Sequence, residues 1–468
     1  MTVAVVLPTF VGVISGGAYT VSKSTYTTNG TAADVQAAVN AARTGSTIVI
    51  PSGSYTWSTG VTISKNLTIT GSGSWSGGSG APLVGGTQIT NKISANGPDL
   101  ISCRVSNGGP PLMIIENLAV LDGGTDTNGN NIRFSGSGTP LLCSCYLHAS
   151  GGVNRCVLWA LNGGVAWNNT CYSDDGNPEI FGFEIPTDNP GRLWQSPSTI
   201  GAADATGTSN TYIEDNTFNN VISQSFDFAD NSRVVLRFNT FNNSGGGSHG
   251  QDTSANGCRH WEIYNNTFIF STSGKTLAGK PYPLNINWWA LLRGGTGVVF
   301  NNVLPKITSM EWGRKNAIAL GDFNINQIPN AVPCQTVYPS ARQIGQTWIG
   351  SGGYSYRTPG TAQVDGTGYG TDPVYFWGNT GTGATSIGYP NQSDLAFPNH
   401  SCGHGMDVTN FIVSGRDYIV GKAKDGYRPY TYPHPLRSQL TRTPTPESTP
   451  TPVAKTSETP HYPPGPRY

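Results

Sequence analysis

A six-residue pattern of apolar and polar positions recurs along the chain, with an asparagine at its centre. The residues three places before and two places after the asparagine are apolar. This pattern suits a short strand followed by a sharp bend, because asparagine tolerates left-handed backbone and caps it with its own amide. The copies, weaker at both ends of the series, are centred on Asn117, Asn169, Asn216, Asn239, Asn266 and Asn302.

The intervals between the copies correspond to the coils of a solenoid. Asn216, Asn239 and Asn266 are 23 and 27 residues apart, and the 47 residues from Asn169 to Asn216 equal about two such periods. A repeated interval of this size indicates one structural unit stacked many times. Asparagines stacked at one corner can hydrogen-bond to one another along the axis. The pattern therefore predicts an all-β fold, a parallel β-helix.

The expected asparagine ladder is irregular in places. Asn66 and Asn91 are candidate earlier rungs, and Cys145 takes the position expected before Asn169. One rung is missing within residues 173–208, which are rich in Pro, Gly and Asp. Insertions into a regular stack are frequent places for function, so we expect this segment to form the wall of a binding cleft.

One short helix is predicted ahead of the stack. Apolar residues recur at helical spacing from Val35 to Ala42 and predict a helix over residues 31–45, capped by Thr31 and Gly45. A helix in this place would cover the open apolar end of the stack. The coils are expected from about residue 46 to residue 310, with an irregular part from about 311 to 436.

The two ends of the chain differ from the repeats. Residues 1–18 resemble a signal peptide that lacks its positive segment, and a truncated start or a first buried strand are the alternatives. Residues 19–436 are the predicted β-helix domain. Residues 437–468 are rich in Thr and Pro and are expected to form an extended, disordered tail that tethers the domain to another module or surface. The expected location is secreted or cell-surface.

Charge and cysteine usage exclude several classes of protein. Only 12% of the residues are charged and the formal net charge is zero, which gives no electrostatic reason to expect nucleic acid as a partner. No run of 18 apolar residues predicts a membrane span. The eight cysteines contain no C-x-x-C pair, which argues against a zinc ribbon. Four of them either pair between neighbouring coils or fill core positions as thiols: Cys143, Cys145, Cys156 and Cys171.

The ladder also predicts which polar residues are neighbours. Residues at equal distance from successive ladder positions should lie above one another, about 4.8 Å apart. Asp227 and His249 lie 11 and 10 residues past consecutive ladder asparagines, and Asp230 and Asp252 lie 14 and 13 past the same two. The pairs Asp227–His249 and Asp230–Asp252 are therefore expected to meet. They form either an acid/base site or a polar column that stabilises the turns.

The same two coils carry two further catalytic candidates, Arg233 and Arg259, 17 and 20 residues past their ladder asparagines. Asp227, Asp230 and Asp252 are also candidate ligands of a calcium ion, the one cofactor expected. A solvated loop is the ordinary interpretation of an acidic run over residues 173–190, and calcium binding is the alternative. That run contains Asp174, Asp175, Glu179, Glu184 and Asp188.

Outward-facing residues supply the candidate substrate-binding set. Glu214, Arg237 and Tyr264 each lie two places before a ladder asparagine, and an ion pair between Glu214 and Arg237 is ordinary for adjacent strands. Tyr264 and Trp167 share this outward position and could stack on sugar rings. Arg237 and Lys275 complete the set.

These features resemble a known superfamily. The helix with the strand that follows it, and the Asn-Thr-Phe rungs, resemble the right-handed parallel β-helix of the pectate-lyase-like superfamily. Within it, residues 216–268 are similar to the alginate lyase/chondroitinase B group, in which a strand with acidic calcium ligands precedes an Arg-Tyr/Phe-Asn-Thr-Phe rung. Ser225-Phe226-Asp227 and Arg237 to Phe241 match those two parts. The catalytic Lys of the group is missing here, and Arg233 and His249 stand at its two basic positions.

The resemblance implies an exported protein that binds a polysaccharide and cleaves a uronic-acid polymer by β-elimination. His249 or Arg233 would take the proton next to the carboxylate, and calcium or Arg259 would offset the charge of the enolate. One alternative is a glycoside hydrolase that uses two of the three aspartates. Another is a carbohydrate-binding or surface-structural β-helix without activity, such as an adhesin or phage-spike module.

Overall fold

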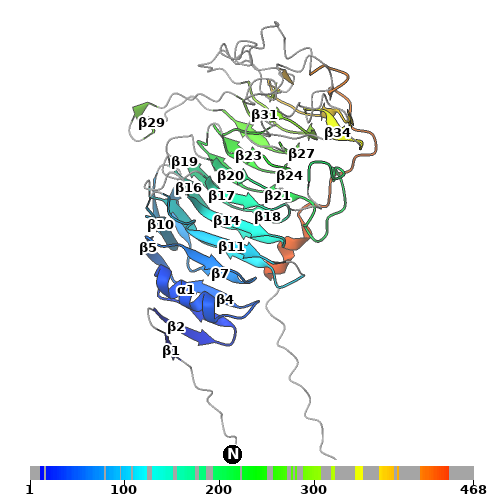
Figure 1. Cartoon of the computed structure of the whole chain (residues 1–468). Coiled ribbons are helices and arrows are strands. Elements are labelled where there is room, and N and C mark those ends of the chain that lie inside the picture. Colours follow the sequence, from blue (N-terminus) through cyan, green and yellow to red (C-terminus); the bar gives the residue numbers. More distant parts are fainter. Residues whose placement is uncertain are drawn as a thin grey trace, which may run out of the picture.

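Successive coils of the chain lie on top of one another and make an elongated stack of strands (Figure 1). The structure is a computed structural model. It describes residues 11–14, 17–78, 81–94, 96–106, 109–123, 129–150, 155–173, 179–185, 193–221, 224–249, 257–270, 276–277, 280–281, 288–306, 318–321, 343–350, 368–383, 387–388 and 412–441.

Three long sheets run along the stack. Sheet 1 is the longest, and from β3 onward all its neighbouring strands are parallel. This arrangement confirms the predicted parallel β-helix. In spatial order, sheet 1 consists of β1 (Val11–Ile14), β2 (Gly17–Ser22), β3 (Thr25–Thr27), β4 (Thr47–Ile50), β7 (Thr68–Gly71), β12 (Met113–Glu116), β15 (Pro140–Cys143), β18 (Val165–Trp167), β21 (Thr211–Glu214), β24 (Arg233–Arg237), β27 (His260–Tyr264), β32 (Thr296–Phe300), β36 (Val374–Trp377) and β38 (Tyr418–Val420).

Sheets 2 and 3 are formed by parallel strands that lie between those of sheet 1 along the sequence. Sheet 2 consists of β28 (Thr267–Ile269), β25 (Thr240–Asn242), β22 (Thr217–Asn219), β19 (Thr170–Ser173), β16 (Tyr146–Ala149), β13 (Ala119–Asp122), β10 (Thr87–Asn91) and β5 (Gly53–Trp57). Sheet 3 consists of β37 (Ile387–Gly388), β33 (Ile318–Gly321), β31 (Ala290–Arg293), β26 (Gly246–Ser248), β23 (Phe226–Phe228), β20 (Glu179–Phe183), β17 (Arg155–Ala160), β14 (Asn130–Gly136), β11 (Ile101–Val105) and β6 (Val61–Ile63).

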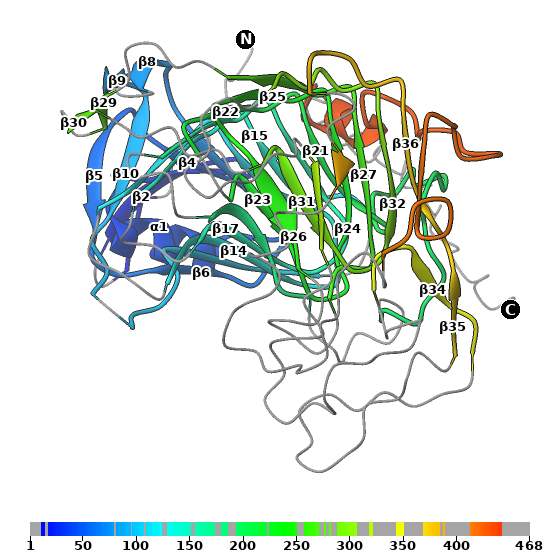
Figure 2. The ribbon, with the colours of Figure 1, turned by 90° about the horizontal axis from the view of Figure 1, so that it is seen from above.

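Smaller elements decorate the three sheets. Antiparallel pairs are formed by β8 (Trp75–Gly78) with β9 (Ala81–Gly85), β29 (Thr276–Leu277) with β30 (Lys280–Pro281), and β34 (Gln346–Trp348) with β35 (Tyr369–Thr371). A 3-10 helix, η3, spans Pro435–Thr441. Figure 2 views the molecule along the stack, with β5 and β10, β14 and β17, and β27 and β32 on different sides of the interior.

The predicted helix is present but shorter than expected. Helix α1 spans Ala32–Ala41, and Thr31 caps its start by accepting a bond from the N–H of Asp34. The expected end at Gly45 is wrong, because Ala42 already has extended backbone. Lys65 explains the earlier end: its ammonium donates to three backbone carbonyls in the last turn, including that of Ala42 at 2.7 Å. The helix packs on β2, β4 and β6 and covers the first coils.

Asparagine side chains form the predicted ladder at the corner between sheets 1 and 2. Nδ2 of each one donates to Oδ1 of the next at 2.8–3.0 Å, and the series runs through Asn169, Asn216, Asn239, Asn266, Asn302 and Asn379. Cys145 lies at the expected place, where its N–H donates to Oδ1 of Asn169 at 2.9 Å. Asn379 extends the ladder one coil beyond the sequence pattern.

The left-handed residue is the one before the ladder position, not the ladder asparagine itself. Asn168, Asp215 and Phe238 have φ of 54°, 56° and 57°. Asn117 also has a positive φ, of 58°, so its assignment as a rung is wrong by one residue and Leu118 takes the ladder position.

Two other expected rungs are corrected by the strand registers. Asn66 precedes β7 and bonds to the backbone of Ser106 and Pro111, and Asn91 lies within sheet 2 opposite Asp122. Neither belongs to the ladder.

The coil from Asn169 to Asn216 is one long coil and not two. β18 pairs directly with β21, and the amides of Asn169 and Asn216 bond to each other. The expectation of a missing rung within residues 173–208 is therefore wrong. The additional residues enlarge a single coil, which contains β20 and the loop 193–210.

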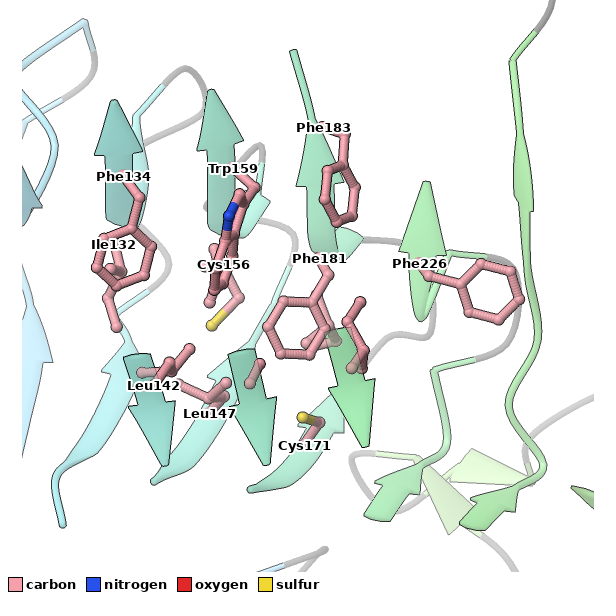
Figure 3. Packing of buried hydrophobic residues seen from close by; sticks show 14 of the residues in the cluster. Ile132, Phe134, Leu142, Leu147, Cys156, Trp159, Cys171, Phe181, Phe183 and Phe226 are labelled. Atoms are coloured by element: carbon pink, nitrogen blue, oxygen red, sulfur yellow. The ribbon is translucent and has the colours of Figure 1, made fainter. Parts of the chain in front are cut away.

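The interior is filled by apolar residues at the two positions that the pattern marks. Phe218, Phe241 and Phe268, two places after their ladder asparagines, stack with ring centroids 4.6 Å apart. Figure 3 shows the same layering where sheet 3 meets the other sheets, with Phe134, Trp159 and Phe181 on successive strands. The described cysteines are all free and buried, so they fill space as thiols: Cys103, Cys143, Cys145, Cys156, Cys171 and Cys258.

A second apolar layer lies outside the stack of coils, on the outer face of sheet 1. Residues 421–441 return along the flank of the stack, where η3 lies beside the middle coils (Figure 1). Tyr427 contacts the rings of Phe300 and Trp377, and Leu436 joins the same apolar cluster. This C-terminal strap, defined as residues 427–437, closes the face that the sequence places toward solvent.

Candidate active site

Asp227 and His249 meet on the outer face of sheet 3. Asp227 is the middle residue of β23, between Phe226 and Phe228, whose rings point into the core. Strand alternation therefore turns the carboxylate outward. His249 directly follows β26, and its Nδ1 lies 2.5 Å from Oδ1 of Asp227. The expected meeting of these two residues is confirmed.

The backbone of His249 is fixed on both sides. Its N–H donates to the carbonyl of Phe228 at 2.8 Å, and its carbonyl accepts from the N–H of Cys258 at 2.7 Å. The imidazole is 15% exposed, whereas the Asp227 side chain is 7% exposed. Nδ1 lies against the carboxylate, although the angle between them is not that of a hydrogen bond, and Nε2 is the ring nitrogen left for another partner.

A second carboxyl group, Glu179, lies beside this pair. Glu179 is the first residue of β20, the strand next to β23, and its carboxyl group interacts with that of Asp227. Burial and the charge of Asp227 raise the pKa of Glu179 to about 8, against the opposing effect of Arg155. Burial also acts to raise the pKa of Asp227, but His249 outweighs it and the pKa ends below its ordinary value. Of the two carboxyl groups, Glu179 is therefore the protonated one and Asp227 is the ionised one.

Two arginines border the carboxyl groups. Nε of Arg155, on β17, lies 2.5 Å from Glu179, and its Nη1 lies 2.7 Å from Glu184. Arg293 ends β31, donates to the carbonyl of Ser248 at 2.8 Å, and contributes to the low pKa of Asp227. Five successive strands of sheet 3 thus contribute to one polar group of Arg155, Glu179, Asp227, His249 and Arg293.

Glycine at 182 makes this arrangement possible. Gly182 pairs with Asp227 in the sheet. A Cβ at this position would lie 2.1 Å from Cδ of Arg155 and 2.5 Å from Oε2 of Glu179. The absence of a side chain lets the Arg155–Glu179 pair lie across β20 and reach Asp227.

Arg233 and Arg259 lie elsewhere, beneath the loop 193–201 on sheet 1. Arg233 donates to the carbonyls of Leu193, Ser196 and Pro197, and Arg259 donates to that of Ser196. Both side chains are buried. Their charge holds the loop against the stack, and they do not join the Asp227–His249 pair.

The candidate substrate-binding residues on sheet 1 are covered. Arg237 forms a fully buried ion pair with Glu214 at 2.7 Å and also donates to Tyr264 and to the carbonyls of Tyr430 and Thr431. Tyr264 and Trp167 are buried under the strap, 1% and 6% exposed. The expectation that these aromatic residues form an open wall for sugars is therefore wrong in this conformation.

The remaining candidates stay predictions. Asp252 and Lys275 lie outside the described residues, and so do Asp174, Asp175 and Asp188. Asp230 occupies a left-handed turn position after β23, with φ of 47°.

The expected calcium ion stays a prediction, because Asp252, one of its three expected ligands, lies outside the described residues. Within the described part of the chain, no group of three His, Cys, Asp or Glu side chains could hold a metal. Asp227 also directs one oxygen at an imidazole nitrogen, whereas calcium prefers oxygen ligands throughout.

The sequence analysis did not place Arg155 or Glu179 in the site, although their distances from the ladder positions match that of His249. Arg155 lies 10 residues past Cys145, and Glu179 lies 10 past Asn169, as His249 lies 10 past Asn239. The interpretation of Glu179 as part of a solvated acidic loop is wrong, because it begins a buried strand. Arg293 had no such signal, since its coil is longer.

Fold and site together define a parallel β-helix protein with a polar acid/base group on one outer face. No family model matches the chain, and no curated protein matches it. Among solved structures, the alginate lyase from Paenibacillus sp. str. FPU-7 aligns with 78% of this chain and 97% of its own, at 13% identity and a TM-score of 0.33. A likeness this weak carries no argument about activity. Among the described residues, no helix has the length and hydrophobicity that a membrane span requires.

Proposed function

We propose that this protein is a polysaccharide lyase that cleaves a uronic-acid-containing polysaccharide by β-elimination at the Asp227–His249 pair. The observation that carries the proposal is the 2.5 Å contact between Nδ1 of His249 and the Asp227 carboxylate. A carboxylate in this place fixes the tautomer of the imidazole and stabilises the imidazolium, so that Nε2 acts as a general base.

In the proposed reaction, Nε2 of His249 takes the proton at C5 of the uronate, next to its carboxylate. The electron pair forms a C4–C5 double bond while the C4–O bond to the neighbouring sugar breaks. The imidazolium then returns its proton to the departing oxygen, so the enzyme regains its starting state. General acid–base transfer of this kind accelerates reactions by about 10²–10⁴-fold.

The flanking residues meet the charge requirements of this step. An enolate intermediate places a second negative charge on the carboxylate, which a guanidinium can offset. Arg155 contacts Glu179, and Arg293 acts to lower the pKa of Asp227. Glu179 stays protonated at neutral pH because burial and Asp227 raise its pKa to about 8, so it adds no charge that would repel an anionic substrate.

The hydrolase alternative fits the described carboxyl groups less well. Glycosidases hold two carboxyl groups about 5–5.5 Å or about 6.5–9.5 Å apart. Asp227 instead lies 2.5 Å from Nδ1 of His249 and is 7% exposed, so the imidazole, at 15%, is the group more open to a substrate.

The test is turnover on a panel of polyuronates, such as alginate and polygalacturonate, and on neutral glucans. A lyase releases products with an unsaturated uronate end, which absorbs in the ultraviolet, whereas a hydrolase releases reducing ends without that absorbance. His249→Ala should abolish the absorbance change. His148→Ala is the matched control, because His148 is a half-buried histidine stacked on Tyr172, on sheet 2. Absorbance that survives in His249→Ala, or no turnover of any polyuronate, would overturn the proposal.

A further inference from the structure

Two positively charged side chains lie beneath the loop 193–201 and donate to the same backbone carbonyl. The carbonyl of Ser196 accepts from Nη2 of Arg233 and from Nε of Arg259, each at 3.2 Å. Two guanidinium groups that share an acceptor repel each other, and burial increases the repulsion because little water screens it.

Arg259 is the less satisfied of the two. Its side chain is fully buried, with Nη2 donating to Oγ1 of Thr347 at 3.2 Å and the guanidinium 4.9 Å from the ring of Trp194. Nη1 is buried and has no acceptor among the described residues. No carboxylate of the described chain lies within ion-pair distance of it. Burial lowers the pKa of Arg259 to about 10, against the opposing charge of Asp372.

A histidine next to this arginine is unsatisfied as well. His260 begins β27 and pairs in the sheet with Arg233. It is completely buried, and neither ring nitrogen has a hydrogen-bond partner in the described part of the protein. Burial, with the charges of Arg233 and Arg259, lowers the pKa of His260. The ring is therefore neutral and offers one N–H donor.

An unpaired buried donor destabilises the folded protein, and a water molecule would satisfy it. Water supplies hydrogen bonds but no net charge, so it leaves the buried guanidinium uncompensated. A small anion supplies both an acceptor for these donors and a negative charge. The donors without acceptors are single buried atoms beside Trp194 and the loop, which favours a monatomic ion over a sugar acid.

We propose that a small monovalent anion of the size of chloride binds beneath the loop 193–201, between Nη1 of Arg259 and the imidazole of His260. Bound there, it would offset the charge of the two arginines and stabilise the long coil between Asn169 and Asn216. The site lies on sheet 1, whereas the Asp227–His249 pair lies on sheet 3, so this proposal is independent of the proposed lyase activity.

The first test compares thermal unfolding in sodium chloride and in sodium gluconate at equal ionic strength. The wild-type protein should unfold at a higher temperature in chloride, with a rise of about 1–3 °C for each tenfold increase in its concentration. Arg259→Met should lose this dependence, whatever its own stability. Arg133→Met is the matched control, because Arg133 is 41% exposed and should leave the dependence unchanged.

The second test needs no variant. Crystals of the wild-type protein grown with sodium bromide should give an anomalous peak within hydrogen-bond distance of Nη1 of Arg259. Three results would overturn the proposal: equal unfolding temperatures in both salts, a chloride dependence retained in Arg259→Met, or bromide peaks confined to exposed positions, which would indicate an adventitious ion only.

Discussion

Nδ1 of His249 lies 2.5 Å from Oδ1 of Asp227, although the two residues belong to different coils of the stack. The contact determines which imidazole nitrogen is available, because the carboxylate occupies Nδ1 and leaves Nε2. It also places the only negative charge of the Glu179–Asp227 pair where it can stabilise an imidazolium. Both consequences can be tested.

Asp227→Asn should lower the rate of polyuronate cleavage by roughly 10²-fold or more while the protein stays folded. The amide keeps the shape of the side chain but cannot stabilise a protonated His249, and its NH₂ group favours the wrong tautomer. The measurement is kcat from the ultraviolet absorbance of the product. Asp122→Asn on sheet 2 is the control, since Asp122 bonds to Ser150 far from the site. A rate within twofold of wild type would rule out the assigned role of Asp227.

Glu179→Gln should change how stability depends on pH. The pKa of Glu179 is raised to about 8 in the folded protein, from an ordinary value of 4.5. The folded state therefore holds a proton that the unfolded chain has released, and the free energy of unfolding falls as the pH rises from about 4.5 to about 8. The slope for one group is on the order of 1 kcal/mol per pH unit. Gln cannot ionise, so this part of the decline should disappear in urea unfolding curves.

Glu262 provides a comparison for that experiment. Burial raises the pKa of Glu262 to about 7, and it accepts bonds from Tyr427 and from the N–H of Gly201. Its contribution falls in the same direction but ends near pH 7, and it cancels from the comparison because both proteins contain Glu262, so the slopes of Glu179→Gln and wild type should differ from about pH 4.5 to about 8. Glu184→Gln, with a side chain 44% exposed, should keep the wild-type slope. The same slope in Glu179→Gln would contradict the raised pKa.

Arg237→Met should destabilise the fold, by about 3–5 kcal/mol in urea unfolding, because it breaks a buried ion pair and leaves the Glu214 carboxylate facing only the partly exposed Arg437 among the described cations. Both side chains are 0% exposed, and Arg237 also fastens the strap through the carbonyls of Tyr430 and Thr431. Adding Glu214→Leu to Arg237→Met should recover part of the loss. The exposed pair Lys422–Asp425 is the control, and Lys422→Ala should leave stability unchanged. A double variant no better than Arg237→Met would show that the loss comes from the strap contacts alone.

Asn239→Ala should cost more than Asn242→Ala, although both remove an amide from the same coil. The Asn239 side chain accepts from Asn216 and donates to Asn266, and each buried group that it leaves unpaired costs about 1–3 kcal/mol. Asn242 makes one side-chain bond, to Asn219, on a partly exposed surface. Chemical unfolding of the two variants measures the difference, and equal losses would show that the ladder adds nothing beyond an ordinary side-chain bond.

The fold and the central pair of the site could be predicted because a stacked coil converts sequence distance into spatial distance. Once Asn216 and Asn239 are neighbours, residues 10 or 11 places further on must be neighbours too, and Asp227 and His249 are. The method also reaches Arg155 and Glu179. It missed them because an acidic run is usually solvated, and only the register of β20 shows that Glu179 lies within a sheet.

Other features had no local signal in the sequence. Arg237 contacts Tyr430 at a separation of 193 residues, and no periodicity indicates that a late segment returns to cover an earlier face. The outward position of Tyr264 was predicted, but its burial was not. Likewise, residue counts alone could not distinguish one long coil from two short ones between Asn169 and Asn216.

In that long coil, distance along the sequence and distance in space are independent of each other, although they change together in most folds. Asn169 and Asn216 are 47 residues apart and Asn216 and Asn239 are 23 apart. The hydrogen bonds between their side-chain amides nevertheless measure 2.8 and 3.0 Å. The corner amides therefore set the alignment of the coils, whatever the length of chain between corners. Loops of new length and sequence can be inserted between the corners while Asp227 still meets His249, so the surroundings of the pair are free to diversify without disturbing the chemistry at its centre.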